Sequence, residues 1–235
     1  MTTRILATGT SRGIGRAIAA ALDRPDVRLL GHATAPAADR IAADLAEAGA
    51  TRGLWDAAYA RLGGVDVLVN NAGVFEANPL ERDDDAWRAS WERTMRINLA
   101  AAAELCRLAV RHWRETGRAG RIVNVASRAA HRGDGPAHWH YAASRAGMVA
   151  MTKTIARAYA AENILAFAVC PGFTMTGMAD DYLASRGGDR LLADIPLGRV
   201  AEPAEVAEAV RFLALDAPPS MTGAVLDVNG ASYVR

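Results

Sequence analysis

Short apolar runs alternate along the chain with longer segments in which apolar residues recur at helical spacing. The apolar runs predict strands at residues 4–8, 27–30, 65–69, 121–126, 164–169 and 224–228. Helical periodicity predicts helices at residues 16–22, 46–62, 86–116, 141–160 and 203–215. Because strands and helices alternate, we expect an α/β fold, a Rossmann-like doubly wound parallel sheet with helices on both faces. No linker or repeat divides the pattern, so a single domain over residues 1–235 is expected.

The connection after the second predicted strand is unusually short. Only 34 residues lie between Leu30 and Val65, where a doubly wound sheet normally fits a helix, a strand and a second helix. Residues 41–45 can form a minimal strand, which leaves residues 34–40 as a tight connection before it. The sequence therefore predicts that the first crossover helix is reduced to a turn or two.

Composition narrows the classes of partner. Hydrophobic residues make up 51% of the chain, and 27 basic residues stand against 26 acidic ones, a balance that argues against disorder and against nucleic acid as a partner. The longest apolar stretch, residues 164–170, is far shorter than the roughly 20 residues that cross a membrane. Cys106 and Cys170 both lie among apolar residues, so no disulfide framework is expected. Together these features favour a cytoplasmic protein.

A glycine-rich segment, TGTSRGIG at residues 8–15, follows the first predicted strand and opens the first predicted helix. Glycines in this position permit positive φ and close approach of a pyrophosphate, and the helix N-terminus offers free N–H groups to its phosphates. The spacing is G-x-x-x-G-x-G, not the commoner G-x-G-x-x-G, and an ordinary strand-to-helix turn is the alternative interpretation.

Further motifs occur in order after this turn. They are Asn70-Asn71-Ala72-Gly73, Asn98, Ser127, the segment YAASR at residues 141–145, the segment PGFTMT at residues 171–176, and residues 222–230. On these motifs the chain resembles the short-chain dehydrogenase/reductase family, specifically its compact TGxxxGxG branch, which includes the 3-oxoacyl-carrier-protein reductases. The resemblance spans nearly the whole chain and implies an oxidoreductase that interconverts a ketone and a secondary alcohol.

The resemblance also assigns catalytic roles. Tyr141 matches the family's acid, Ser127 matches the serine that holds the substrate oxygen, and Asn98 matches the asparagine that supports a water in the proton relay. Taken singly, each residue also has an ordinary structural interpretation. Tyr141 is typical of a half-buried aromatic, Ser127 of a serine that caps a loop, and Asn98 of a polar residue on a helix surface. The substrate is expected to be a small carbonyl compound or alcohol, whose identity the sequence does not give.

Arg145 departs from the family pattern, which has a lysine four residues after the tyrosine. Arginine keeps the positive charge and can donate to ribose hydroxyls, but it does not readily give up a proton, so a relay through it should fail. Lys153 lies 12 residues beyond Tyr141, about 18 Å along a helix, and cannot substitute. The alternative to an active enzyme is therefore a cofactor-binding protein with weak or no turnover.

The cofactor is expected to be NADP(H) in preference to NAD(H). The second predicted strand is followed by no carboxylate until Asp39, so nothing there would bind a free ribose 2′-hydroxyl or repel a 2′-phosphate. Arg12, and His32 at the strand end, are expected near that phosphate. The resemblance implies further cofactor contacts, from Gly9, Ser11, Gly13, Ile14, Gly15, Asp44, Leu45, Asn71, Ala72, Gly73, Tyr141, Arg145, Pro171, Gly172 and Thr174. For Asn71 a purely structural role is the alternative.

Two loops flank the expected site. Residues 173–195 are expected to form a substrate lid, because loops of this length are usually functional or disordered. His131, His138 and His140 precede the catalytic helix, where surface exposure is favoured over a place in the pocket. No carboxylate or cysteine near them in sequence completes a ligand set, so no metal site is expected.

The resemblance implies a homo-oligomer, a tetramer or dimer formed by the long helices around Asn98 and after Tyr141. Residues 100–103, Ala142 and Ala143 are small enough for close helix contact, although alanine-rich faces also fit the core of a monomer.

Overall fold

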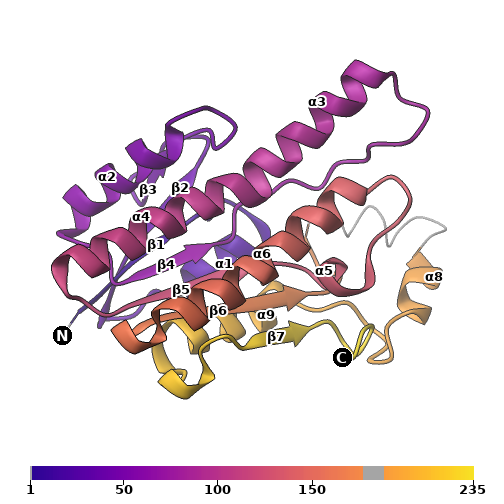
Figure 1. Ribbon diagram of the computed structural model, residues 1–235. Helices are drawn as coiled ribbons and strands as arrows, with labels where there is room; N and C mark the ends of the chain where they lie inside the picture. The colour runs from indigo at the N-terminus through magenta and orange to yellow at the C-terminus, as the bar shows by residue number, and fades with distance from the viewer. Residues whose placement is uncertain (1, 177–187) are drawn as a thin grey trace.

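The computed structural model of the protein describes residues 2–176 and 188–235. Its centre is a sheet of seven parallel strands in the order β3-β2-β1-β4-β5-β6-β7 (Figure 1). The strands are β1 (Thr3–Ala7), β2 (Val27–Ala33), β3 (Arg40–Ala42), β4 (Val67–Asn70), β5 (Gly120–Val125), β6 (Ile164–Pro171) and β7 (Val225–Val228). Apolar runs form β4, β5 and β6 because central parallel strands are covered on both faces, and every residue of β6 is buried.

Helices cover both faces of the sheet. They are α1 (Gly13–Ala21), α2 (Ala50–Leu62), α3 (Asp84–Met95), α4 (Ala101–Thr116), α5 (Ala129–Arg132), α6 (Trp139–Tyr159), α8 (Gly188–Ala193) and α9 (Pro203–Arg211). Short helical turns are η1 (Arg96–Ala100), η2 (Ala160–Glu162), η3 (Phe212–Asp216) and η4 (Pro219–Met221). One core joins the sheet to α2, α4 and α6, and a second core joins the opposite face to α1 and α9. The doubly wound α/β fold is therefore confirmed.

The link between β2 and β3 is even shorter than expected. Residues 34–39 contain no helix, and Gly31 of β2 pairs directly with Arg40 of β3. The Gly31 N–H donates to Asp39 O at 2.9 Å, which draws the returning chain against the strand. Parallel strands usually need a dozen or more connecting residues, so the link suffices only because β3 has three residues and lies at the sheet edge.

The helix expected from residue 46 begins later, at Ala50. Residues 43–49 form turns instead, and the Asp44 side chain accepts a hydrogen bond from the Ala46 N–H at 2.9 Å. A short Asp side chain bonded to the backbone two residues on favours a turn over a helix. The helix therefore starts only after Gly49, whose φ is +80°.

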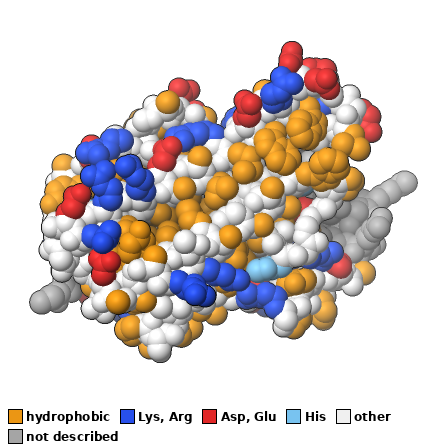
Figure 2. Space-filling view, viewed as in Figure 1, with side chains coloured by type: hydrophobic (Ala, Val, Ile, Leu, Met, Phe, Trp, Pro, Cys, Tyr) orange, Lys and Arg blue, Asp and Glu red, His pale blue; other side chains and the backbone are white. Residues whose placement is uncertain are grey.

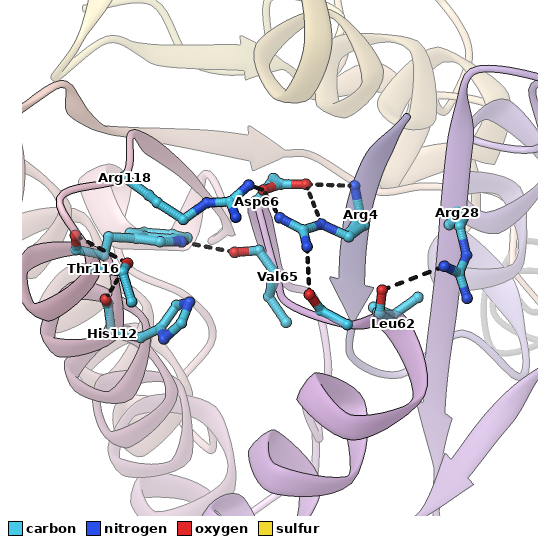
Figure 3. Close-up of polar contacts among 10 residues, drawn as sticks. Arg4, Arg28, Leu62, Val65, Asp66, His112, Thr116 and Arg118 are labelled. Atoms are coloured by element: carbon cyan, nitrogen blue, oxygen red, sulfur yellow. Dashed lines mark hydrogen bonds and ion pairs between the residues drawn. The ribbon is translucent and has the colours of Figure 1, made fainter. Parts of the chain in front are cut away.

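At the amino end of the sheet, Asp66 ties β1 to the segment before β4 (Figure 3). Its carboxylate accepts from Arg4 N at 3.0 Å, Nε at 2.7 Å and Nη2 at 2.6 Å, and from Arg118 Nη2 at 3.2 Å. Trp113 Nε1 donates to the neighbouring Val65 O at 2.7 Å. Burial raises the pKa of Asp66, but the hydrogen bonds and charge of Arg4 outweigh it and leave that pKa below its ordinary value.

A buried chain of side-chain amides and a hydroxyl holds α6 against the middle of the sheet. Asn70 Nδ2 on β4 donates to Asn124 Oδ1 on β5, and Asn124 Nδ2 donates to Thr152 Oγ1 on α6, each at 2.8 Å. Because these groups are shielded from water, the bonds fix the position of α6, on which Tyr141 and Arg145 lie. Cys106 and Cys170 are both buried and free, as expected.

None of the helices in the described part of the chain is both long enough and apolar enough to span a lipid bilayer.

Candidate active site

The glycine-rich segment forms a tight turn between β1 and α1. Gly9 has φ +71° and Gly13 has φ +51°, and a Cβ on Gly15 would lie only 1.8 Å from Gly9 O. No other residue fits at position 15 without moving the turn. In the described structure α1 has no side-chain N-cap, so its first N–H groups point from the turn without helical partners. This arrangement suits a bound anion such as a pyrophosphate.

The segment that directly follows β4 is hydrogen-bonded to the turn. Asn71 Nδ2 donates to Thr8 O at 3.0 Å and to Gly9 O at 3.1 Å. Thr8 Oγ1 accepts from the N–H groups of Asn71 and Ala72, both at 3.0 Å. The amide of Asn71 thus has the structural role that was its alternative interpretation, since its N–H groups are used within the protein.

His32 differs from expectation. Its side chain is buried, Nδ1 accepts from the Gly9 N–H at 3.2 Å, and Nε2 donates to Ala43 O at 3.0 Å. Burial lowers the pKa of His32, against the opposing effects of the Ala43 hydrogen bond and the Asp44 charge, so the ring is neutral at pH 7. A neutral ring with both nitrogens bonded to backbone supports the turn and offers no charge to a phosphate. This bonding pattern left no signal in the sequence.

Other predicted cofactor contacts are distributed around the turn. Ser11 and Arg12 are exposed, and the Arg12 guanidinium forms no ion pair with any described residue. Asp44 is exposed, whereas Leu45 is buried in the core and contributes packing.

Asn98 lies in η1, a π-helical turn that joins α3 to α4 as one continuous helical segment. The Asn98 side chain is fully buried, with Oδ1 accepting from Val74 N at 2.8 Å and Nδ2 donating to Val74 O at 2.9 Å. Nδ2 also lies 3.3 Å from Ser144 Oγ on α6. Single π-helical turns occur frequently at functional sites, and this one directs Asn98 between the β4 loop and α6.

Tyr141 and Arg145 lie one turn apart on α6. The guanidinium carbon of Arg145 is 5.2 Å from the centroid of the Tyr141 ring, and Nη1 donates to Val125 O at 3.2 Å. Arg145 is 5% exposed, yet no carboxylate pairs with it and its Nε has no hydrogen-bond partner among the described residues. A buried cation without an anionic partner is costly, which makes this position a candidate for contact with a ligand.

Gly73 provides the space for the guanidinium. A Cβ at this position would lie 2.0 Å from Arg145 Nη2 and 3.1 Å from Asn98 Oδ1. The two side chains therefore converge on one backbone position at the carboxyl end of β4. Any larger residue at position 73 would displace Arg145.

Ser127 follows β5 by two residues and lies just before α5. Its Oγ accepts a hydrogen bond from the Ala129 N–H at 3.1 Å, which leaves the hydroxyl hydrogen available as a donor. Since Arg145 bonds to Val125 O on the same strand, the end of β5 carries Ser127 and an anchor for Arg145 together.

The segment after β6 returns to the glycine-rich turn. Thr174 Oγ1 donates to Gly172 O at 3.2 Å, and a Cβ on Gly13 would lie 3.1 Å from Thr176 Cγ2. Pro171, Gly172 and Thr174 therefore lie between the end of β6 and the glycine-rich turn. Of the expected lid at residues 173–195, positions 177–187 lie outside the described residues.

An aromatic wall beside Tyr141 was not predicted. Phe75 stacks on His138 with ring centroids 4.2 Å apart and packs edge-on against Tyr141 at 4.8 Å. His140 is buried, contrary to the surface position favoured for it, and stacks on Trp91 with centroids 6.2 Å apart. Phe75 lies only two residues after Gly73, but a lone phenylalanine in a loop gives no signal of this contact.

Four features lie together at the carboxyl edge of the parallel sheet. They are the glycine-rich turn after β1, the π-helical turn that carries Asn98, Ser127 after β5, and Tyr141 on α6. A family model of these enzymes, described as enoyl-(acyl carrier protein) reductase, matches residues 9–231. The chain belongs to the short-chain dehydrogenase/reductase family. The expected family and the expected class of enzyme, an oxidoreductase, are both confirmed.

Similar proteins match nearly the whole length of this short-chain dehydrogenase/reductase. The 3-oxoacyl-(acyl-carrier-protein) reductase FabG of Haemophilus influenzae is 34% identical over 241 residues, covering 97% of each chain. The FabG of Escherichia coli is 34% identical over 245 residues, covering 97% of this chain and 96% of its own. Nodulation protein G of a Rhizobium species is 35% identical over 239 residues, covering 97% and 95% respectively.

Proposed function

We propose that this oxidoreductase uses NADP(H) to interconvert a ketone and a secondary alcohol, with Tyr141 as the acid and base. The observation that carries the proposal is Arg145, a buried cation that lies beside the Tyr141 ring and pairs with no carboxylate of the described residues. Such a group is explained by a ligand that supplies hydroxyl acceptors, as the nicotinamide ribose does.

The residues present fit a dinucleotide. The N–H groups at the start of α1 would hold the pyrophosphate, and Arg145 and Tyr141 would contact the nicotinamide ribose. The backbone after β6, at Gly172 and Thr174, would hold the nicotinamide amide. When bound, the cofactor supplies or accepts the hydride.

The protein's own groups act on the oxygen of the substrate. Ser127, whose Oγ accepts from Ala129, donates its hydroxyl hydrogen to the carbonyl oxygen and fixes its position. Tyr141 gives its phenolic proton to that oxygen as negative charge develops, and removes it in the reverse direction. Arg145 stabilises the phenolate through its charge, and Asn98 holds the neighbouring Val74 loop in place.

Preference for NADP(H) is supported by the charges around the end of β2. Asp39 pairs with Arg40 at 2.9 Å and Asp44 caps the Ala46 N–H, so both carboxylates near this end are engaged. Arg12 lies exposed in the turn, where it can pair with a 2′-phosphate. Tighter binding of NADPH than NADH, lost in Arg12→Gln, is the expected result of fluorescence titration.

The deciding experiment measures NADPH oxidation with β-ketoacyl thioesters, diketones and aryl ketones. Tyr141→Phe should lower kcat by about 10²- to 10⁴-fold, because it removes the general acid, while NADPH still binds. Tyr59→Phe, which changes an exposed tyrosine on α2, is the matched control and should leave kcat unchanged. Full turnover by Tyr141→Phe would refute the proposal.

A cofactor-binding protein with weak or no turnover is a second candidate, favoured by the guanidinium of Arg145. Because arginine keeps its proton, the phenolate of Tyr141 must regain its proton by a route that avoids this side chain. Turnover by Arg145→Lys together with no measurable turnover by the natural chain would support this candidate. Turnover by the natural chain would exclude it.

We also infer that the protein forms a homo-oligomer, a tetramer or a dimer. Hydrophobic side chains gather over α3 and along the face of α4 and α6 (Figure 2). Trp139, at the start of α6, is 52% exposed. Light scattering coupled to size-exclusion chromatography measures the assembly, and a monomeric mass at micromolar concentration would contradict the inference.

A further inference from the structure

Three side chains that the proposed reaction does not use meet at the carboxyl ends of β6 and β7. His131 of α5, Cys170 of β6 and Asp227 of β7 each present one ligand atom, and these atoms all lie within 4.8 Å of one another. Cys170 Sγ is 3.6 Å from His131 Nε2. The sheet register pairs Cys170 directly with Asp227, which explains why residues so distant in sequence lie together.

The separation of Cys170 Sγ and His131 Nε2 fits a tetrahedral metal ion. Zinc binds cysteine sulfur at about 2.3 Å and histidine nitrogen at about 2.0 Å, which places the two ligand atoms about 3.5 Å apart. The observed separation of sulfur and nitrogen, 3.6 Å, agrees with that geometry. Sulfur, nitrogen and carboxylate oxygen together form the ligand set that zinc and related borderline-soft ions prefer.

Groups around the cluster hold two of the ligands in place. Arg235 Nε donates to Asp227 Oδ2 at 3.0 Å, which fixes the position of the carboxylate. The His131 ring stacks on Tyr233 with an interplanar angle of 3° and centroids 5.6 Å apart. Such outer contacts orient the ligands before a metal arrives.

Cysteine binds a metal as the thiolate, so a metal ion has to displace the proton of the Cys170 thiol. That proton is released on binding.

We propose that His131, Cys170 and Asp227 form a binding site for a zinc-class divalent cation, with the fourth coordination position open to water. None of the three side chains takes part in the proposed reaction, although Cys170 directly precedes Pro171 and Gly172 of the proposed nicotinamide site. Sequence reasoning excluded a metal because it considered only the histidines before α6, and neither Cys170 nor Asp227 is near His131 in the chain.

The test is titration of the metal-free, untagged protein with Zn²⁺ by calorimetry and with Co²⁺ by absorption spectroscopy. We expect one equivalent of Zn²⁺, the release of a proton, and a thiolate-to-cobalt charge-transfer band with the intense visible bands of tetrahedral cobalt. Asp227→Asn, His131→Gln and Cys170→Ser should each weaken binding by at least about tenfold, and Cys170→Ser should abolish the charge-transfer band.

Matched controls come from the same chain. Cys106→Ser changes the other buried cysteine, and His112→Gln changes another partly exposed histidine, so both should bind zinc as the natural protein does. Asp227 is exposed, so Asp227→Asn should fold normally, which circular dichroism checks. Absence of stoichiometric zinc binding, binding unchanged in Asp227→Asn, or an octahedral cobalt spectrum without sulfur would each overturn the proposal.

Discussion

At the amino end of the sheet, the Asp66 carboxylate is matched by Arg4 and Arg118, whereas at the carboxyl end Arg145 is buried without a carboxylate among the described residues. Both ends carry partly or wholly buried charge. The first end has completed its hydrogen bonds within the protein, and the second has left a donor unused. Completed bonds stabilise the fold, while an uncompleted one costs stability unless a ligand supplies the missing partner.

The difference indicates that the two ends of the sheet have different roles. Residues at the amino end, such as Trp113 and Asp66, join strands to helices and loops. Residues at the carboxyl end, such as Ser127 and Arg145, keep hydrogen-bonding capacity toward the site. Substitutions at the two ends should therefore have opposite effects on stability and on activity.

The largest effect is expected for Arg145→Leu. Loss of the cation beside Tyr141 should lower kcat/KM by about 100-fold or more, because a charge aimed at the developing phenolate is lost. The free energy of unfolding should stay constant or rise, since an incompletely bonded buried charge is removed. Steady-state kinetics and urea denaturation measure the two quantities. A variant that loses stability and keeps activity would reverse the comparison.

Gly73→Ala should rank second. Its Cβ would lie 2.0 Å from Arg145 Nη2, the far end of a long side chain, so the guanidinium has to move while the free energy of unfolding changes little. Activity should fall, because Arg145 leaves its position beside Tyr141. Thermal unfolding and NADPH oxidation test the prediction, and full turnover would contradict it.

Asp66→Asn should affect stability alone. Removing the carboxylate should lower the free energy of unfolding by about 1–2 kcal/mol at pH 7, a value reduced by its partial exposure, while kcat stays unchanged. Asp39→Asn, whose carboxylate is largely exposed, is the matched control and should have a smaller effect.

The Asp66 contribution should also depend on pH. The folded-state pKa of Asp66 is lowered, so its stabilising effect is present above the unfolded value of about 4 and is lost as pH falls through the folded value. The difference between the natural protein and Asp66→Asn should therefore shrink in urea denaturations below pH 4. A constant difference down to pH 2 would argue against the ion pair as its cause.

Gly53→Ala should have the smallest effect, with opposite sign. Gly53 lies inside α2, and a Cβ there meets nothing within 4 Å. The substitution should raise the free energy of unfolding by about 0.5–1 kcal/mol through helix propensity, and leave activity unchanged. It also serves as the control for Gly73→Ala, because both replace glycine by alanine but only one meets a side chain.

The fold was predictable because its signal is local and repeated. Apolar runs specified six of the strands, and the 34 residues between Leu30 and Val65 predicted the missing crossover helix. The start of α2 was misplaced because the turn at Asp44 competes with the helix through a single side-chain bond. Such competition depends on geometry that periodicity does not register.

The candidate site was predictable only where a motif names its residues. Ser127, Tyr141 and Asn98 follow from the family pattern. The neutral, buried state of His32 depends on Ala43, which a tight turn brings to it, and the position of Phe75 against Tyr141 depends on loop packing. Contacts of this kind arise from the tertiary structure and have no counterpart in residue spacing.

The six-residue link between β2 and β3 also bears on how the sheet assembles. Gly31 and Arg40 are nine residues apart, whereas Thr3 and Val27, paired between β1 and β2, are separated by 24. Closing the shorter loop costs about 0.9 kcal/mol less chain entropy, if both behave as flexible loops. This edge of the sheet can therefore form before the long crossovers bring the central strands together.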